Sequence, residues 1–184
     1  MLLLCGASAS GKTEIVKLLT KRYAYHKFIT TTTRPKRPHE VDGIDYYFLD
    51  SALFNKLNMD GGFIETTDYQ TNQYGSRADQ INDSMVAILD PSGINAFYSK
   101  RPREDYIVYI KADKDTRKYR MLKRDDDLEV IWKRLDIDDE TFHPDNLTHI
   151  DLNLENNSGS LNDLADTIHT HYQAFLKERP WDLM

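Results

Sequence analysis

Hydrophobic residues gather in short runs along this chain of 184 residues, and longer amphipathic stretches lie between the runs. Four apolar runs predict buried strands, at residues 2–5, 85–89, 106–110 and 150–154. Apolar residues that recur at helical spacing predict helices, at residues 13–19, 116–123, 129–135 and 161–176. Strands that alternate with helices are typical of an α/β protein, so we expect a three-layer α/β/α sandwich with a parallel core sheet.

Residues 30–84 have a different pattern. The stretches DYYFLD, GGFIETTDY and NQYGS are rich in aromatic residues and are broken by Gly, Asn and Asp, which predicts a small mixed β subdomain inserted into the core. A charged run, KRDDDLEV, separates two predicted helices and has the composition of a mobile lid, which we place at about residues 124–134. We therefore expect a single domain over residues 1–184, whose core consists of residues 1–29, 85–123 and 135–184.

The formal net charge of −6 limits the expected partners. The chain has no global basic field, so we expect neither nucleic acid nor a membrane as partner, and any anionic ligand must meet local clusters of Lys and Arg. The single cysteine, Cys5, lies in the first apolar run. It excludes an internal disulfide and fits a cytoplasmic protein with a buried thiol. We expect a monomer or a homodimer.

The segment between the first predicted strand and helix has the residue types of a phosphate-binding loop. It reads GASASGKT and fits G-x-x-x-x-G-K-[ST] at every fixed position, with Gly6, Ala7, Ser8, Ala9, Ser10, Gly11, Lys12 and Thr13 as the loop residues. Glycines let the backbone approach an anion closely, and the loop N–H groups point at phosphate oxygens. Lys12 is expected to reach the β- and γ-phosphates of a nucleoside triphosphate, and the Thr13 hydroxyl to coordinate Mg²⁺. Asp90 ends the apolar run at 85–89 and is expected to hold Mg²⁺ through water, like a Walker-B carboxylate.

A second cluster of positive charge lies in the stretch TTTTRPKRPHEVDGIDYYF, residues 30–48. Four threonines precede Arg34, Lys36 and Arg37, and two prolines stiffen the segment. A run of charge is usually a solvated turn. Here guanidinium groups, hydroxyls and tyrosines alternate in an otherwise acidic chain, and together they can hold a second phosphate.

The same stretch resembles the signature of the guanylate kinases, which are P-loop nucleoside monophosphate kinases. Its run T-T-R-P-K-R-P-x-E-V-D-G-x-D-Y-x-F carries the resemblance, which continues at FIETTDYQTNQYGS, ILDPSG, RKYRMLKRDDDLEVIWKRL and DLNLEN. These blocks span nearly the whole chain in the family's order. The resemblance implies an enzyme that moves the γ-phosphoryl group of ATP to GMP, with dGMP as a further acceptor, and that uses Mg²⁺.

The resemblance also implies residues for the acceptor. Those that bind its phosphate are Arg34, Arg37, Tyr46 and Tyr74, and those that read its guanine base are Thr30, Glu65 and Ser76. A carboxylate such as Glu65 suits guanine, because it can accept hydrogen bonds from N1–H and N2–H together. Adenine would meet the same carboxylate with repulsion, since its N1 is an acceptor.

The remaining implied residues belong to the lid and the donor nucleotide. Arg124 and Arg134, with Arg120 as a further candidate, match positions that close over the transferring phosphoryl group. Such cations stabilise charge on its equatorial oxygens. Asn156 matches a position near the adenine of ATP. The expected catalytic set is Lys12, Arg34, Arg124 and Arg134.

The chain departs from the family pattern at Ser92. Relatives usually carry D-x-D at the end of this strand, and the second Asp helps to read guanine, whereas here the strand ends DPSG and Ser92 takes that place. Two alternatives to a GMP kinase therefore stay open: a kinase of the same fold with another nucleoside monophosphate acceptor, and a non-catalytic guanylate-kinase-like binding domain. Lys12 and Thr13 argue against the binding domain, since such domains have typically lost the phosphate loop.

Overall fold

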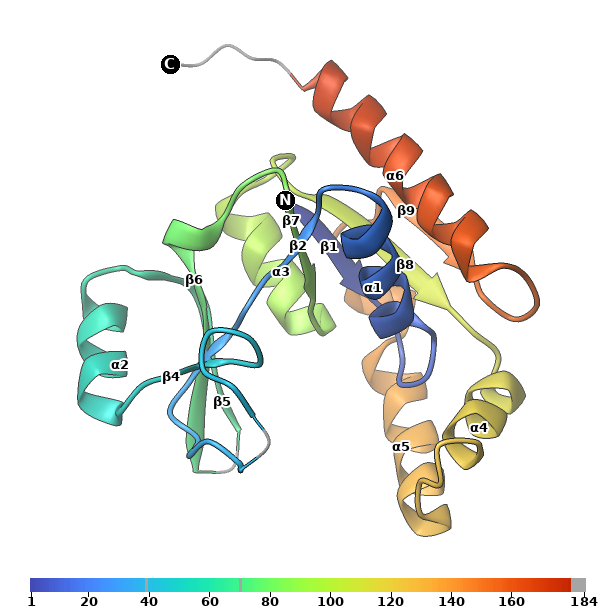
Figure 1. Ribbon diagram of the computed structural model, residues 1–184, viewed down its shortest axis with the longest axis horizontal. Helices are drawn as coiled ribbons and strands as arrows, with labels where there is room; N and C mark the ends of the chain where they lie inside the picture. The colour runs from blue at the N-terminus through green and yellow to red at the C-terminus, as the bar shows by residue number, and fades with distance from the viewer. Residues whose placement is uncertain (39, 70, 180–184) are drawn as a thin grey trace.

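A five-stranded parallel sheet forms the centre of the molecule (Figure 1). The computed structural model describes residues 1–38, 40–69 and 71–179. The strand order is β2-β7-β1-β8-β9, with bounds His26–Lys27, Met85–Ile88, Leu2–Cys5, Tyr106–Lys111 and Leu152–Glu155. The predicted α/β class and parallel sheet are confirmed. The weak run expected from Ile150 becomes a strand only at Leu152, and the short, exposed strand β2 was not predicted.

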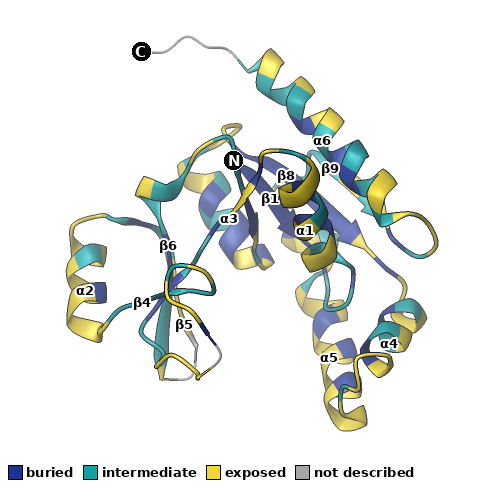
Figure 2. Cartoon of the chain, in the orientation of Figure 1, coloured by how far each residue is buried: buried dark blue, intermediate teal, exposed yellow. Residues whose placement is uncertain are grey.

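The two faces of this sheet are covered by different helices. Along β1, Leu2 and Leu4 pack with α1 (Lys12–Arg22) and α6 (Leu161–Glu178), while Leu3 and Cys5 pack with α3 (Pro91–Lys100). This alternation follows from the twofold repeat of a strand, because a central parallel strand is apolar on both faces. Figure 2 shows the buried residues concentrated along the sheet and on the helix faces turned toward it. Cys5 is a free, buried core thiol, as expected, and burial raises its pKa to about 11.

A second sheet projects to one side of the core (Figure 1). Its order is β4-β3-β6-β5, with bounds Tyr47–Phe48, Thr31–Thr32, Asn72–Arg77 and Phe63–Tyr69. Strands β3 and β4 are parallel and the other pairs antiparallel, so the predicted mixed sheet is confirmed. Helix α2 (Ser51–Met59) was not predicted in this segment. It begins at Asp50, whose carboxylate accepts the Leu53 N–H at 2.7 Å, and its buried Phe54 stacks on Phe63 at a ring distance of 4.6 Å.

Helices α4 (Lys114–Leu122) and α5 (Leu128–Thr141) form a hairpin on the other side of the core (Figure 1). Met121, Ile131 and Leu135 are buried between them. Residues 123–127 are the whole connection, so the segment expected as a lid includes the first half of α5. Asp127 begins α5 because its side chain accepts the N–H groups of Glu129 and Val130. Two short 3₁₀ helices, Ala78–Gln80 and Pro144–Asn146, complete the described elements.

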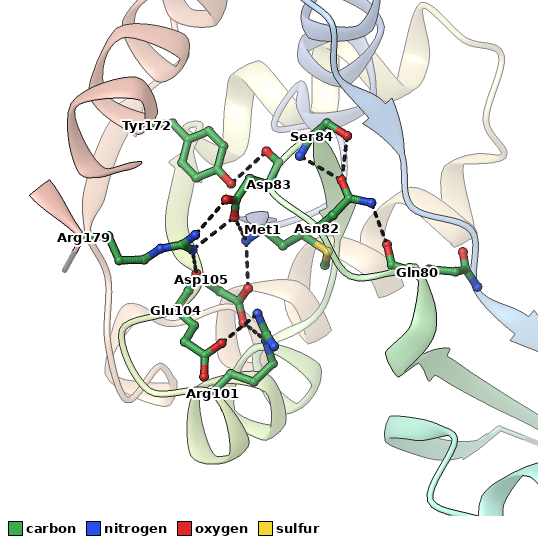
Figure 3. A network of polar contacts seen from close by, with 10 residues as sticks. All are labelled: Met1, Gln80, Asn82, Asp83, Ser84, Arg101, Glu104, Asp105, Tyr172 and Arg179. Carbon is green, nitrogen blue, oxygen red and sulfur yellow. Dashed lines mark hydrogen bonds and ion pairs between the residues drawn. The ribbon is translucent and has the colours of Figure 1, made fainter. Parts of the chain in front are cut away.

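A polar network ties the end of α6 to the loops that precede two inner strands of the core sheet, β7 and β8 (Figure 3). The Arg179 guanidinium binds both carboxylate oxygens of Asp83, at 2.7 and 3.1 Å, and the Tyr172 hydroxyl donates to the Asp83 carbonyl at 3.0 Å. The amine of Met1 lies 3.0 Å from the buried carboxylate of Asp105, which Arg101 also contacts. These contacts fix α6 against the loops that precede β7 and β8. In the described residues, no helix is both long and apolar enough to cross a membrane.

Candidate active site

The segment from Gly6 to Gly11 joins β1 to α1, and Lys12 and Thr13 are the first residues of that helix. The two glycines of the phosphate loop are needed for geometric reasons. Gly6 has φ +145° and Gly11 has φ +103°, values that side chains with a Cβ rarely adopt. A Cβ on Gly6 would overlap the carbonyl oxygen of Ile110, and one on Gly11 would overlap the Asn156 amide. Ala9 is also left-handed, with φ +59°. A backbone in which residues with positive φ are interspersed among residues with negative φ turns successive N–H groups toward one point, where an anion can bind.

The Lys12 ammonium group lies inside the loop. It donates to the carbonyl oxygens of Gly6 at 2.5 Å and Ala7 at 2.8 Å, and to the Ser10 hydroxyl at 3.3 Å. Burial lowers the pKa of Lys12 to about 8. A partly desolvated cation among loop carbonyls is well placed to meet a phosphate that enters the loop.

Asn156 and Arg120 brace the loop from the outside. The Asn156 amide donates to the Ser10 carbonyl at 2.8 Å, and Arg120 donates to the carbonyls of Ala9 at 3.1 Å and Asn156 at 2.9 Å. The resemblance places Asn156 near the adenine of ATP, and the structure places it against the phosphate loop. Arg120, expected as a lid cation, is held on backbone carbonyls.

A cleft of about 720 Å³ opens beside the loop and the hairpin. Lys12, Thr13, Arg120, Arg124 and Asn156 are among the residues that line it. Of the two expected lid arginines, the structure therefore brings Arg124 to the loop, where it also pairs with Asp126 at 2.7 Å. Arg134 is exposed on α5 and is not among the residues that line this cleft.

Two residues that contact or approach the loop were not identified from the sequence. The Ser8 N–H donates to the Asp138 carboxylate at 2.6 Å, and Asp138 pairs in turn with Arg117 of α4. Both side chains are buried, although they come from helices whose surfaces are otherwise charged. Helical spacing alone carries no signal for this pairing, since it depends on how the hairpin docks against the loop.

The residues expected at the acceptor phosphate come together on the second sheet. The Arg34 guanidinium lies 5.4 Å from the ring centre of Tyr46, and the Tyr46 and Tyr74 rings are 6.1 Å apart. Arg34 is held by the buried Glu40 at 2.6 Å, and Glu40 also accepts the Arg37 N–H at 2.8 Å. These bonds lower the pKa of Glu40 to about 2, and the bond to Arg34 has the largest effect. Glu40 had no assigned role, although its place in the basic stretch is visible in the sequence.

Two of the three residues expected at the guanine base, Glu65 and Ser76, form a second group on this sheet. Ser76 of β6 donates to one Glu65 oxygen at 2.5 Å across the β5–β6 pair, and Thr67, on the same strand as Glu65, donates to the other at 3.4 Å. Burial raises the pKa of Glu65. The Thr30 carbonyl accepts the Tyr47 N–H at 3.0 Å, which joins the Arg34 stretch to β4. Glu65 is thus held in one orientation by hydroxyl donors.

Asp90 and Ser92 begin helix α3. Asp90 Oδ1 accepts the Gly93 N–H and the Ser92 hydroxyl, both at 2.8 Å. Both bonds fall on one oxygen, which leaves Oδ2 for a further ligand. In the described parts of the chain no three His, Cys, Asp or Glu side chains cluster as a metal site. An exposed hydroxyl on Thr13 and a carboxylate oxygen on Asp90 are oxygen donors of the kind that Mg²⁺ takes through one or two protein groups and water, so this donor set fits the ion.

Comparison with known proteins finds a family model that covers most of the chain. A family model described as guanylate kinase matches residues 1–174. Over 143 residues the chain is 29% identical to the guanylate kinase of Coxiella burnetii, which covers 73% of this chain and 69% of that protein. It is 31% identical to a guanylate kinase of Thermus thermophilus over 143 residues, 74% of this chain and 65% of that one. The crystal structure of guanylate kinase from Anaplasma phagocytophilum shares the fold, with a TM-score of 0.64 at 19% identity over 95% of this chain and 85% of its own.

Proposed function

Because this chain belongs to the guanylate kinase family, we propose that it transfers the γ-phosphoryl group of ATP to GMP. The family makes the protein a nucleoside monophosphate kinase, a phosphotransferase. ATP as the donor, Mg²⁺ as the ion and dGMP as a further acceptor are parts of the proposal.

The observation that supports the proposal is that two clusters of groups suited to hold an anion lie on different parts of the fold. Lys12 and the loop amides belong to the core, while Arg34, Tyr46 and Tyr74 belong to the part of the chain that forms the second sheet. A nucleotide switch needs only the first cluster. A kinase that joins a triphosphate to a monophosphate needs both, with the two phosphates brought together between them.

The proposed mechanism needs positioning and charge neutralisation, without a covalent intermediate. The loop amides and Lys12 bind the β- and γ-phosphates, Arg34 and Arg37 hold the acceptor phosphate, and Glu65 with Ser76 orients the base. Arg124 reaches the donor cleft from the hairpin and stabilises charge on the transferring group. Mg²⁺, held by Thr13 and through water by Asp90, would supply further neutralisation of phosphate charge.

The direct test is a phosphoryl-transfer assay with ATP and Mg²⁺ over a panel of acceptors: GMP, dGMP, IMP, AMP, CMP and UMP. We expect GMP to give the highest kcat/KM. Lys12→Ala should lower kcat by about 10²-fold or more, since a charge-assisted contact to the reacting phosphates is lost. Lys17→Ala is the matched control, because Lys17 is exposed on the same helix and pairs with Glu14 one turn away. If both variants keep near-native turnover while folded by circular dichroism, the loop is not catalytic.

A kinase with another acceptor is the second candidate, and Ser92 is the observation that favours it. The Ser92 hydroxyl donates to Asp90, and it has no charge with which to read guanine. An ionised acceptor strengthens a hydrogen bond by about 1 kcal/mol over a neutral one, which is several-fold in affinity. In titration calorimetry, Ser92→Asp should therefore bind GMP more tightly than the wild type does, and the difference in affinity between GMP and IMP should increase. Better binding of AMP or a pyrimidine monophosphate by the wild type would establish the other acceptor.

A further inference from the structure

A carboxylate of helix α5 occupies a hydrogen-bond donor of the phosphate loop. The Ser8 N–H donates to Asp138 Oδ2 at 2.6 Å, and the Asp138 residue is only 7% exposed. Amides of such a loop are the groups that bind phosphate oxygens. A carboxylate and a phosphate are both anionic acceptors, so they compete for this N–H.

Arg117 of helix α4 lies behind Asp138 and has unused donors. It is 3% exposed, and its Nη2 pairs with Asp139. Its Nη1 lies 3.8 Å from Asp138 Oδ2, beyond hydrogen-bond distance. Within the described residues, Nε and Nη1 of Arg117 are buried and have no hydrogen-bond partner. Buried donors without a partner are costly, so an acceptor that came closer would be bound favourably.

We propose that Asp138 is a positioning residue that exchanges partners when a phosphate enters the loop. The phosphate oxygen takes the Ser8 N–H, and the displaced carboxylate moves the short distance to Arg117 Nη1. One anion thus replaces another at the amide, and Nη1 of the buried guanidinium receives a hydrogen-bond partner that it lacks. The inference rests on the proposed function for the identity of the triphosphate, and on the contacts of Ser8, Asp138 and Arg117 for the exchange itself.

The exchange links the loop to the hairpin that carries Arg124. Asp138 and Arg117 come from the two helices of that hairpin, and their closer approach would tighten it while releasing its bond to the loop. A static brace would behave differently. If the Ser8–Asp138 bond only supported the loop, its loss would weaken phosphate binding, whereas the loss of a competitor strengthens it.

The test is the dissociation constant for Mg–ATP and for tripolyphosphate, measured by calorimetry. Asp138→Asn keeps the shape and removes the charge, and we expect both ligands to bind about fivefold more tightly, since a neutral acceptor competes less well for the amide. Asp136→Asn is the matched control: it removes the same charge from the same helix, where the Asp136 side chain is 73% exposed and pairs with Lys114 rather than with Arg117. We expect less than a twofold change for Asp136→Asn. Equal effects of the two substitutions, or weaker binding by Asp138→Asn, would overturn the exchange.

A measurement on the wild type keeps the inference testable if Asp138→Asn does not fold. On addition of tripolyphosphate, the ¹⁵N side-chain resonances of Arg117 should shift and its Nη1 protons should exchange more slowly with solvent. Unchanged Arg117 resonances at saturating tripolyphosphate would refute the exchange. If the wild type binds tripolyphosphate but not ATP, the proposed function fails. The response of the Arg117 resonances to tripolyphosphate still tests whether Asp138 exchanges partners.

Discussion

The brace from Asn156 to the phosphate loop yields a prediction whose size can be worked out. Asn156 is 2% exposed, and its amide donates to the Ser10 carbonyl at 2.8 Å. Asn156→Ala leaves that buried carbonyl without its partner, at a cost of about 1–3 kcal/mol. The Arg120 guanidinium loses a bond of 3.2 Å to the same side chain but keeps its contacts with backbone carbonyls, so it adds little.

We therefore expect Asn156→Ala to lower the free energy of unfolding by about 2 kcal/mol. For a protein of this size, each kcal/mol shifts Tm by roughly 2–4 °C, so Tm should fall by about 4–8 °C. The affinity for ATP should also fall, because the amide lies directly against Gly11 and holds the turn of the loop. Urea unfolding followed by circular dichroism measures the first effect, and calorimetry with Mg–ATP measures the second.

Asn153→Ala is the control for this prediction. Asn153 is exposed on β9, the strand that ends just before Asn156, so the same substitution there should change stability by less than about 0.5 kcal/mol. Equal stabilities of the two variants would refute the brace. A destabilised Asn156→Ala that keeps native ATP affinity would show that the contact supports the fold without shaping the loop.

Three further predictions concern the acceptor cluster and the loop turn. Arg37→Ala should raise KM for the acceptor far more than KM for ATP in steady-state assays, and equal effects on both would contradict the two-site assignment. The hydrogen bond from Arg34, followed by that from the Arg37 N–H, lowers the pKa of Glu40 to about 2. The stability that Glu40 contributes is therefore present above pH 4.5 and is lost as the pH falls toward about 2. The stability difference between wild type and Glu40→Gln should accordingly be constant above about pH 5 and shrink below it in denaturant titrations; a difference that persists at about pH 2 would count against the ion pair. Gly6→Ala should give little folded protein, because its Cβ meets the Ile110 carbonyl and its φ is +145°, and native yield and Tm would disprove that close approach.

Features that depend on neighbouring residues in the chain were predictable from the sequence. The phosphate loop and the strand before it have local signals, since glycine positions and an apolar run specify them directly. Helix α3 also has a local signal, an Asp followed by Pro at its first turn, but the apolar run before Asp90 favours interpreting this residue as the end of a strand. Helix α2 is short, and only Phe54 is buried on it, so its hydrophobic pattern is weak.

Contacts between distant segments could not be predicted from local pattern. Asp138 and Arg117 look like solvated residues of charged helices, and only the docking of α4 and α5 buries them beside Ser8. Glu40 is only six residues from Arg34, but their pairing depends on the conformation of a loop, and no regular spacing specifies that conformation. Such pairs are properties of the tertiary arrangement, and a single sequence gives no spacing by which to recognise them.

The central place of β1 has a consequence for how the protein is made. Leu2 pairs with Val86 on one side and with Tyr106 on the other. The backbone groups along the two edges of β1 therefore find their strand partners only after the chain that forms β7 and β8 has been synthesised. Contacts between such distant segments form slowly. During translation this apolar strand and its unpaired edges stay exposed on the ribosome, where nascent chains are prone to aggregate. The segment that holds the phosphate loop is thus synthesised before either of the strands that flank β1 in the sheet.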